Sequence, residues 1–207
     1  MPIASGTVSY LRFAAPPVPA DFEQRFCEAL YNHRFLEIDP RSDVEKAQGW
    51  VRFDDAFESV FDAQTLLHPS GQLLFRLRID TLKVPAPTLK AYTDQAARAK
   101  ATATGRERLA KKELDQLKLE IKQQLRVKSL PKLQLVEVAW NVSTGEVRLF
   151  ATSKAVAGLF VDKFEKTFEV ALKVIGLLDV LAVRGMPQEE IDALAMLEPE
   201  RFHLIPR

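Results

Sequence analysis

The sequence has few of the residues and patterns on which several common classes of function depend. Its 207 residues include one cysteine, Cys27, so an internal disulfide is excluded. Its eight glycines form neither GxGxxG nor GxxxxGK[ST], the loops that cradle nucleotide phosphates. Residues 1–19 hold one basic residue and no apolar run long enough for a signal sequence or a membrane span. We therefore expect a cytoplasmic protein that neither hydrolyses nucleotides nor enters a membrane.

Catalytic residues are equally scarce. The three histidines are far apart and show neither metal-ligand spacing nor a triad pattern: His33, His68 and His203. Four carboxylates are close enough in sequence to suggest a Mg²⁺-dependent nuclease: Asp54, Asp55, Glu58 and Asp62. No histidine or lysine motif accompanies them, and a polar loop or strand edge is the simpler interpretation. We therefore predict no catalytic residue, no metal site and no cofactor.

Charge is the feature that is present, and it is local. The formal net charge is only +1, so a site for an anionic partner must be confined to part of the chain. Residues 98–132 hold eleven basic against four acidic residues. Basic side chains at helical spacing can bind phosphates along a duplex without contacting the bases. The predicted DNA-binding residues are Arg98, Lys100, Arg106, Arg108, Lys111, Lys112, Lys118, Lys122, Arg126 and Lys128.

Residues 106–128 are predicted to form the main helix of this basic region. Apolar residues recur there every three or four positions: Ala110, Leu114, Leu117, Ile121 and Leu125. Lys111, Lys118, Lys122 and Arg126 fall on an adjacent face. The same pattern also fits a solvated amphipathic helix with intrahelical ion pairs, such as Glu107 with Lys111. The sequence pattern is compatible with a DNA-binding helix and with a solvated one.

The rest of the chain predicts an α+β fold made of two small, mostly antiparallel sheets or hairpins packed with amphipathic helices. Alternating or β-rich runs predict strands over residues 7–13, 35–38, 49–53, 64–68, 72–80, 133–142 and 146–151. Helical spacing predicts helices after Pro19, over 87–103 and 106–128, after Ser153 and over 187–197. Phe160, Phe164 and Phe168, together with Trp50 and Trp140, are expected in the core.

Three regions follow from this order of elements. Residues 1–84 form an N-terminal α+β region, 85–132 a basic helical segment, and 133–207 a C-terminal region of a hairpin and helices. The three could also form one continuous domain. Hydrophobic residues make up 47% of the chain, which suffices for one large core or two small ones.

The order of segments resembles that of the RdgC family of recombination-associated proteins. The opening of the family is matched by three short stretches, residues 10–12, 34–35 and 49–51. Residues 71–78 followed by Lys83-Val84-Pro85 resemble the family's strand and its K-x-LP turn, with valine in place of leucine. Residues 105–122 resemble the family's basic helix. Residues 140–172 resemble the family's second hairpin and the phenylalanine-rich helix that follows it.

This resemblance implies a non-enzymatic protein that binds double-stranded DNA with little sequence preference. It further implies a ring-shaped homodimer with a basic hole, association with the nucleoid and restraint of RecA-type strand exchange. The chain departs from the family in two ways. It stops at Arg207, short of the usual length, so the resemblance does not carry a closed ring over to it. The family's LPRAF stretch at a finger tip corresponds to residues 125–132, which contain no aromatic residue.

Two alternatives belong to other functional classes. The amphipathic helix could dock a protein partner instead of DNA, in an interaction module that keeps the fold. The carboxylates at residues 54–62 could serve a Mg²⁺-dependent nuclease, the weaker of the two ideas.

Overall fold

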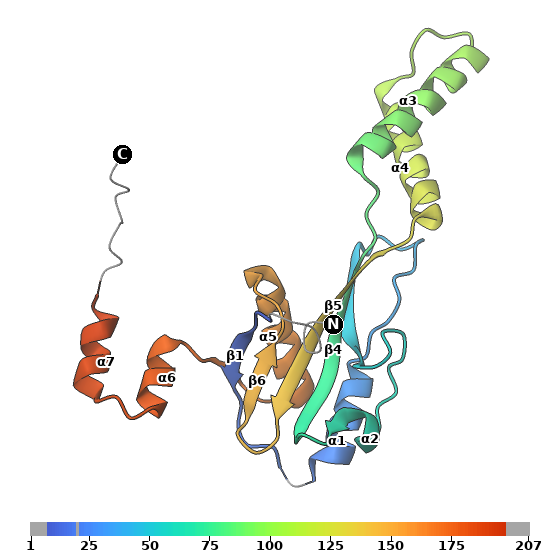
Figure 1. Cartoon of the computed structure of the whole chain (residues 1–207). Helices are drawn as coiled ribbons and strands as arrows, with labels where there is room; N and C mark the ends of the chain where they lie inside the picture. Colours follow the sequence, from blue (N-terminus) through green and yellow to red (C-terminus); the bar gives the residue numbers. More distant parts are fainter. Residues whose placement is uncertain (1–7, 20, 198–207) are drawn as a thin grey trace.

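The computed structural model describes residues 8–19 and 21–197 and confirms an α+β fold (Figure 1). Within these residues seven strands form one antiparallel sheet in the order β2-β4-β5-β6-β1-β7, with β3 paired to the start of β4. The strands are β1 (Leu11–Ala14), β2 (Lys46–Arg52), β3 (Leu67–His68), β4 (Gln72–Thr81), β5 (Lys132–Asn141), β6 (Glu146–Leu149) and β7 (Lys173–Val174).

A single sheet replaces the two small sheets expected from the sequence. β4 and β5 pair over ten residues, from Gln72 opposite Asn141 to Thr81 opposite Lys132. This pairing joins the N-terminal and C-terminal strands into one body. The sequence pattern did not indicate it because alternation within a strand shows which face is buried, whereas the partner strand lies 50 residues away.

The helices in the described residues are α1 (Phe22–Asn32), α2 (Ala63–Leu66), α3 (Ala86–Ala103), α4 (Lys111–Lys128), α5 (Lys154–Phe168), α6 (Leu177–Val183) and α7 (Gln188–Ala195). Three expectations need correction. Residues 35–38 form no strand, and the pairing beside them is an isolated bridge between Arg34 and Trp50. Residues 64–66 belong to the short helix α2, which Asp62 caps by accepting the Thr65 amide, so the strand expected over 64–68 is confined to Leu67 and His68. The long basic helix begins at Lys111, since the Glu113 carboxylate accepts the amide of Ala110 there.

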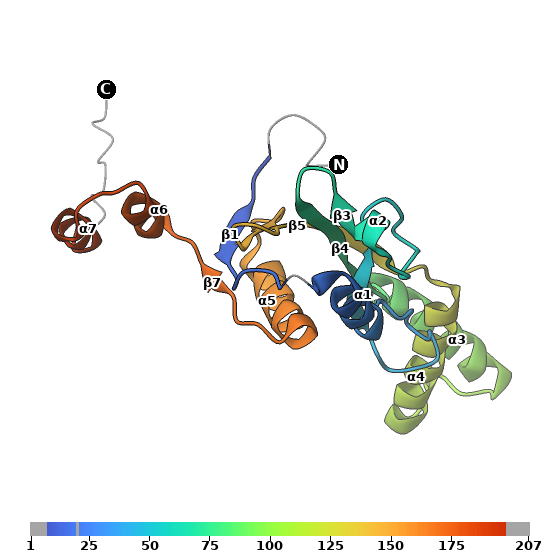
Figure 2. The ribbon, with the colours of Figure 1, turned by 90° about the horizontal axis from the view of Figure 1, so that it is seen from below.

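The core lies on one face of the sheet, where α1 and α5 lie side by side (Figure 2). The ring of Phe168 is central to it, with centroids 4.6 Å from Phe164, 4.9 Å from Phe26 and 5.2 Å from Trp140. Trp50 is fully buried, and its indole N–H donates to the Thr167 hydroxyl at 2.7 Å. The aromatic residues predicted for the core are therefore confirmed there, and α5 is held to the sheet by them.

The opposite face of the sheet carries buried charges in pairs. Arg76 contacts Glu137 at 3.2 Å and Arg78 contacts Asp80 at 2.7 Å, and all four side chains are nearly inaccessible. The Arg78 guanidinium also lies 4.1 Å from the centroid of the Phe35 ring. Burying a charge is costly unless it is paired, so these arginines are committed to structure and are not open to an external anion.

Two helical elements project from this body (Figure 1). The larger consists of α3 and α4 and is inserted between β4 and β5, at the end of the sheet where Thr81 and Lys132 pair. We call residues 86–128 the basic hairpin. The smaller consists of α6 and α7, which contact each other and follow the edge strand β7. The basic hairpin is the element that holds the predicted DNA-binding residues.

Candidate nucleic-acid interface

The basic hairpin is a pair of antiparallel helices of equal length. α3 and α4 each contain 18 residues, and Thr93, Ala101 and Leu117 are buried between or beside them. The turn that joins them passes through Gly105, whose φ of +63° is accessible to glycine at little cost. Pro85 and Pro87 begin α3, where a missing amide leaves no hydrogen bond unmade. The local sequence thus specifies two helices with a sharp reversal.

Three lysines form a stripe along α4. At 100° per residue, Lys111, Lys118 and Lys122 lie within about 40° of one another around the helix axis. Glu113 and Glu120 lie about 140 to 180° away from this stripe, by the same geometry. The acids of α4 therefore mostly face away from its lysine side, with Asp115 as the exception.

Seven of the ten predicted DNA-binding residues are exposed and have no ion-pair partner within the part of the chain that the structure describes. They are Arg98, Lys100, Arg108, Lys111, Lys112, Lys118 and Lys128. The expected pair between Glu107 and Lys111 is not formed. The structure instead pairs Arg106 with Glu113 at 3.3 Å.

Lys122 is engaged with the body of the protein. Its ammonium nitrogen lies 3.0 Å from Glu45, a residue of the loop that precedes β2. The hydrogen bond from Lys122, helped by its charge, lowers the pKa of the Glu45 carboxyl below its ordinary value. Both side chains remain partly exposed. A phosphate could therefore compete with Glu45 for this lysine.

Arg126 was predicted to contact DNA, and the structure contradicts that assignment. Only 3% of the residue is exposed. Its guanidinium donates hydrogen bonds to the carbonyl oxygens of Pro40, Leu82 and Val44. The position of Arg126 on the polar side of α4 made it look solvated, because helical periodicity does not reveal that a loop from residues 40–45 covers the last turns of this helix.

The basic hairpin and the rest of the chain differ in charge. Residues 86–128 hold eleven basic and five acidic residues, a net charge of +6. The remaining 164 residues hold 18 basic and 23 acidic residues, a net charge of −5. Because the hairpin projects from the body, its positive charge is presented to solvent largely apart from the acidic remainder (Figure 1).

The carboxylates considered for a nuclease have local structural partners instead. Asp54 accepts from Arg52 at 2.9 Å, and this bond lowers the pKa of Asp54. Asp55 accepts the amide of Phe57, Glu58 accepts the amides of Ser59 and Val60, and Asp62 caps α2. Within residues 8–19 and 21–197, no group of three or more histidines, cysteines or acids is arranged to hold a metal ion.

The histidines also serve local structure. His33 contacts the Ala29 carbonyl and His68 contacts the Ser70 hydroxyl. His203 lies outside the described residues. In the described part of the chain, no helix has the length and apolar character needed to cross a bilayer.

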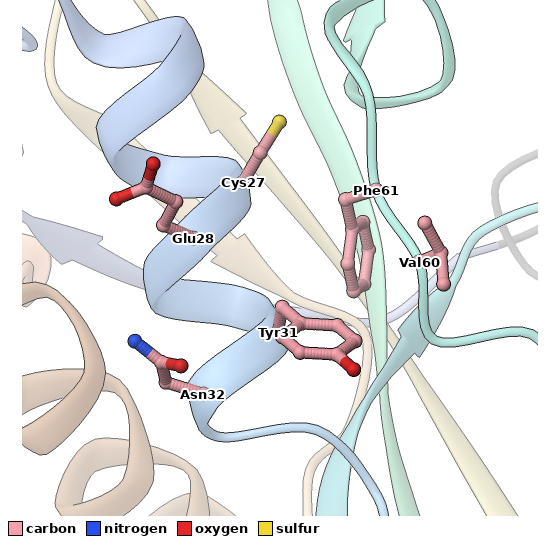
Figure 3. A pocket seen from close by; sticks show the side chains of 6 residues that line it. All are labelled: Cys27, Glu28, Tyr31, Asn32, Val60 and Phe61. Atoms are coloured by element: carbon pink, nitrogen blue, oxygen red, sulfur yellow. The ribbon is translucent and has the colours of Figure 1, made fainter.

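The single cysteine, Cys27, is half-buried and lines a cavity of about 350 Å³ (Figure 3). Cys27 and Tyr31 of α1 line it together with Val60 and Phe61 of the loop before α2. Burial, together with the nearby charge of Asp62 and Glu23, raises the pKa of the Cys27 thiol. A protonated, half-buried thiol is a poor nucleophile.

Comparison of the chain with protein-family models finds no match, and comparison with curated protein sequences finds no significant match.

Proposed function

We propose that the basic hairpin binds double-stranded DNA through its phosphates and without sequence preference. The observation that carries this proposal is the separation of charge: a hairpin with a net charge of +6 projects from a remainder of −5. Seven exposed basic side chains on it have no ion-pair partner in the described chain. Neutralising phosphates with such groups releases condensed counterions, which is the main source of non-specific affinity.

The dimensions of the hairpin favour contact with the backbone rather than with the bases. Each helix of 18 residues is about 27 Å long, and two packed helices have axes about 8 to 10 Å apart. The major groove is about 12 Å wide and admits one helix, not a pair side by side. Contacts to phosphate position a protein on DNA but carry little sequence information. The proposed binding is therefore independent of sequence.

The resemblance to the RdgC family extends the proposal to recombination. On that basis the protein coats duplex DNA as a homodimer, restrains RecA-type strand exchange, acts without catalysis, and resides with the nucleoid in the cytoplasm. The position of the basic hairpin after the Lys83-Val84-Pro85 turn supports the comparison. Residues 125–132 lack the family's aromatic tip, so the proposed contact is made by charge alone and includes no wedge between bases.

Fluorescence anisotropy with a labelled duplex of about 20 base pairs tests the proposal at several salt concentrations. We expect log affinity to fall linearly with log salt, with a slope of up to about −6 if all seven exposed residues contact phosphates. Two duplexes of unrelated sequence should bind equally well.

The variant Lys111→Gln/Lys118→Gln should reduce the magnitude of that slope by about 1.8 and weaken binding on the order of tenfold or more near 0.1 M salt. The matched control is Lys154→Gln/Lys166→Gln, which removes the same charge from exposed positions on α5. An equal loss of DNA affinity in both variants would show a general effect of charge and refute the assigned interface. Affinity that does not change with salt would refute phosphate contact altogether.

A protein-docking role is the second candidate, and the exposed apolar residues of the hairpin favour it. Tyr92 on α3 is 51% exposed and Leu119 on α4 is 50% exposed. A partner helix could bury them. The same titration separates the candidates, because absence of DNA binding at micromolar protein and low salt supports docking.

A further inference from the structure

Arg126 joins the basic hairpin to the body through all three nitrogens of its guanidinium. Nε donates to the Pro40 carbonyl at 3.2 Å, Nη1 to the Leu82 carbonyl at 3.4 Å and Nη2 to the Val44 carbonyl at 2.8 Å. Two of these carbonyls belong to the loop before β2, and the third lies just after β4. One side chain of α4 thus holds two separate segments of the body.

A second link lies one turn earlier on the same helix. Lys122 contacts Glu45, and the Glu45 carbonyl accepts the amide of Leu82 at 2.9 Å. The two links therefore converge on the same place, where the loop of residues 40–45 meets the end of β4. Apart from this place, α3 and α4 pack mainly against each other. The hairpin is otherwise attached by two short connections, residues 82–85 and 129–131.

Only arginine suits this position. Its guanidinium is planar, always charged and presents donors in several directions, whereas lysine offers a single nitrogen. With Arg126 removed, the carbonyls of Pro40, Leu82 and Val44 lose this donor. The last turns of α4 would then lose the contacts that fix their angle to the sheet.

We propose that Arg126 is a positioning residue that sets the direction in which the basic hairpin projects from the sheet. The inference rests on the proposed DNA binding for its functional consequence, since a fixed direction places the lysine stripe before a duplex meets it. A hairpin that swings must be ordered on binding, and that ordering weakens affinity. Arg126 acts in this way without touching a phosphate.

The direction of the hairpin is measured first, without DNA. Spin labels are attached through Ala103→Cys at the end of α3 and Ser143→Cys in the turn after β5, in a Cys27→Ser background. Both positions are exposed. Pulsed electron paramagnetic resonance should give a narrow distance distribution for the parent protein and a broad one for Arg126→Gln. The control Lys128→Gln removes one charge from the same end of α4 and should leave the distribution narrow.

DNA binding is measured next by anisotropy in the same variants. Arg126→Gln should bind about fivefold more weakly, while its salt slope stays that of the parent. Lys118→Gln should show the opposite combination, with a slope smaller in magnitude by about 0.9 and a narrow distance distribution. The more conservative Arg126→Lys keeps the charge, so its salt slope should not change. Because lysine offers a single nitrogen, this variant should still broaden the distance distribution. It therefore tests the proposal even where Arg126→Gln fails to fold.

Each result decides one question. A narrow distribution in folded Arg126→Gln or Arg126→Lys overturns the positioning role. A slope that falls in Arg126→Gln as it does in Lys118→Gln overturns it as well, because Arg126 would then contact phosphate. If the parent protein binds no DNA, the proposed function fails, and the distance distributions still decide whether Arg126 fixes the hairpin.

Discussion

Two regions of the molecule are built on different principles. One is the body, formed by the sheet with α1 and α5, and the other is the basic hairpin. The former buries a continuous group of aromatic rings, with Phe168 in contact with Phe26, Trp140 and Phe164. The latter buries few side chains, and one of them, Arg126, is charged. Burial of apolar area is the main stabilising contribution to folding, so the body carries most of the stability.

Stability and charge are therefore separated in this protein. The residues outside the hairpin include the apolar core and have a net charge of −5. The hairpin has a net positive charge and depends on the body for its direction through Arg126 and Lys122. A change in one region should therefore have little effect on the other, and four experiments test this separation.

The largest effect on stability is expected for Phe168→Ala. The ring is 3% exposed and contacts rings from α1, α5 and the sheet, so its loss leaves a cavity. We expect a decrease of about 3 to 5 kcal/mol in the free energy of unfolding, measured by urea denaturation. The control Leu36→Ala, at a position 64% exposed, should change it by less than about 0.5 kcal/mol. Equal effects would contradict a single core on this face.

A smaller and local effect is expected for Leu117→Ala in the hairpin. Leu117 of α4 is buried, in a hairpin that has few other buried side chains. We expect a decrease of about 1 to 2 kcal/mol in the free energy of local unfolding, confined to the hairpin. Hydrogen exchange should show faster exchange in α3 and α4 and unchanged protection in β4 and β5. Faster exchange throughout the sheet would show that the two regions unfold as one unit.

A pH dependence of about 1 kcal/mol is expected from Glu146, which links β6 to β1. Burial raises the pKa of Glu146, but hydrogen bonds from Arg148 and Arg12 outweigh burial and hold it below its ordinary value. A carboxylate with a depressed folded pKa stabilises above its unfolded pKa, and this contribution is lost as the pH falls through the folded value. Stability should therefore fall below about pH 4 to 5.

Urea denaturation across that range measures the effect. In Glu146→Gln, the loss of unfolding free energy on acidification should be smaller by about the same 1 kcal/mol. An unchanged pH profile in this variant would assign the acid sensitivity to other carboxylates.

The smallest effect on the body is expected from shortening the hairpin. Replacing residues 90–121 with a short glycine-serine loop keeps Lys122, Arg126 and the paired ends of β4 and β5. The unfolding temperature of the sheet should shift by only a few degrees, because the entropy of closing a loop depends only weakly on its length. DNA binding should be lost in the anisotropy assay. A protein that fails to fold would show that the hairpin is required by the body.

Much of the fold could be predicted from local pattern. The phenylalanines of α5 recur at helical spacing, and Trp50 and Trp140 lie in apolar strands, so their burial followed from the sequence. The pairing of β4 with β5 did not, because it joins strands separated by 50 residues. The class was therefore predicted correctly, while the number of sheets was not.

The candidate site divides in the same way. The concentration of lysine and arginine in residues 98–132 is a property of the sequence. Which of these side chains remain available depended on what the rest of the chain places beside them. Lys111 and Lys118 face solvent, whereas the loop of residues 40–45 engages Lys122 and covers Arg126. No periodicity within α4 distinguishes these pairs.

The sequence by itself determined the longer helices, the aromatic core and the excess of positive charge in the middle of the chain, because propensity, periodicity and composition are local. The tertiary structure alone decided that the strands form one sheet and that the hairpin projects from its end. It also decided that Arg126 serves as an anchor. These outcomes depend on contacts between residues far apart in the chain, where the geometry of packing selects among side chains that local pattern treats as equivalent.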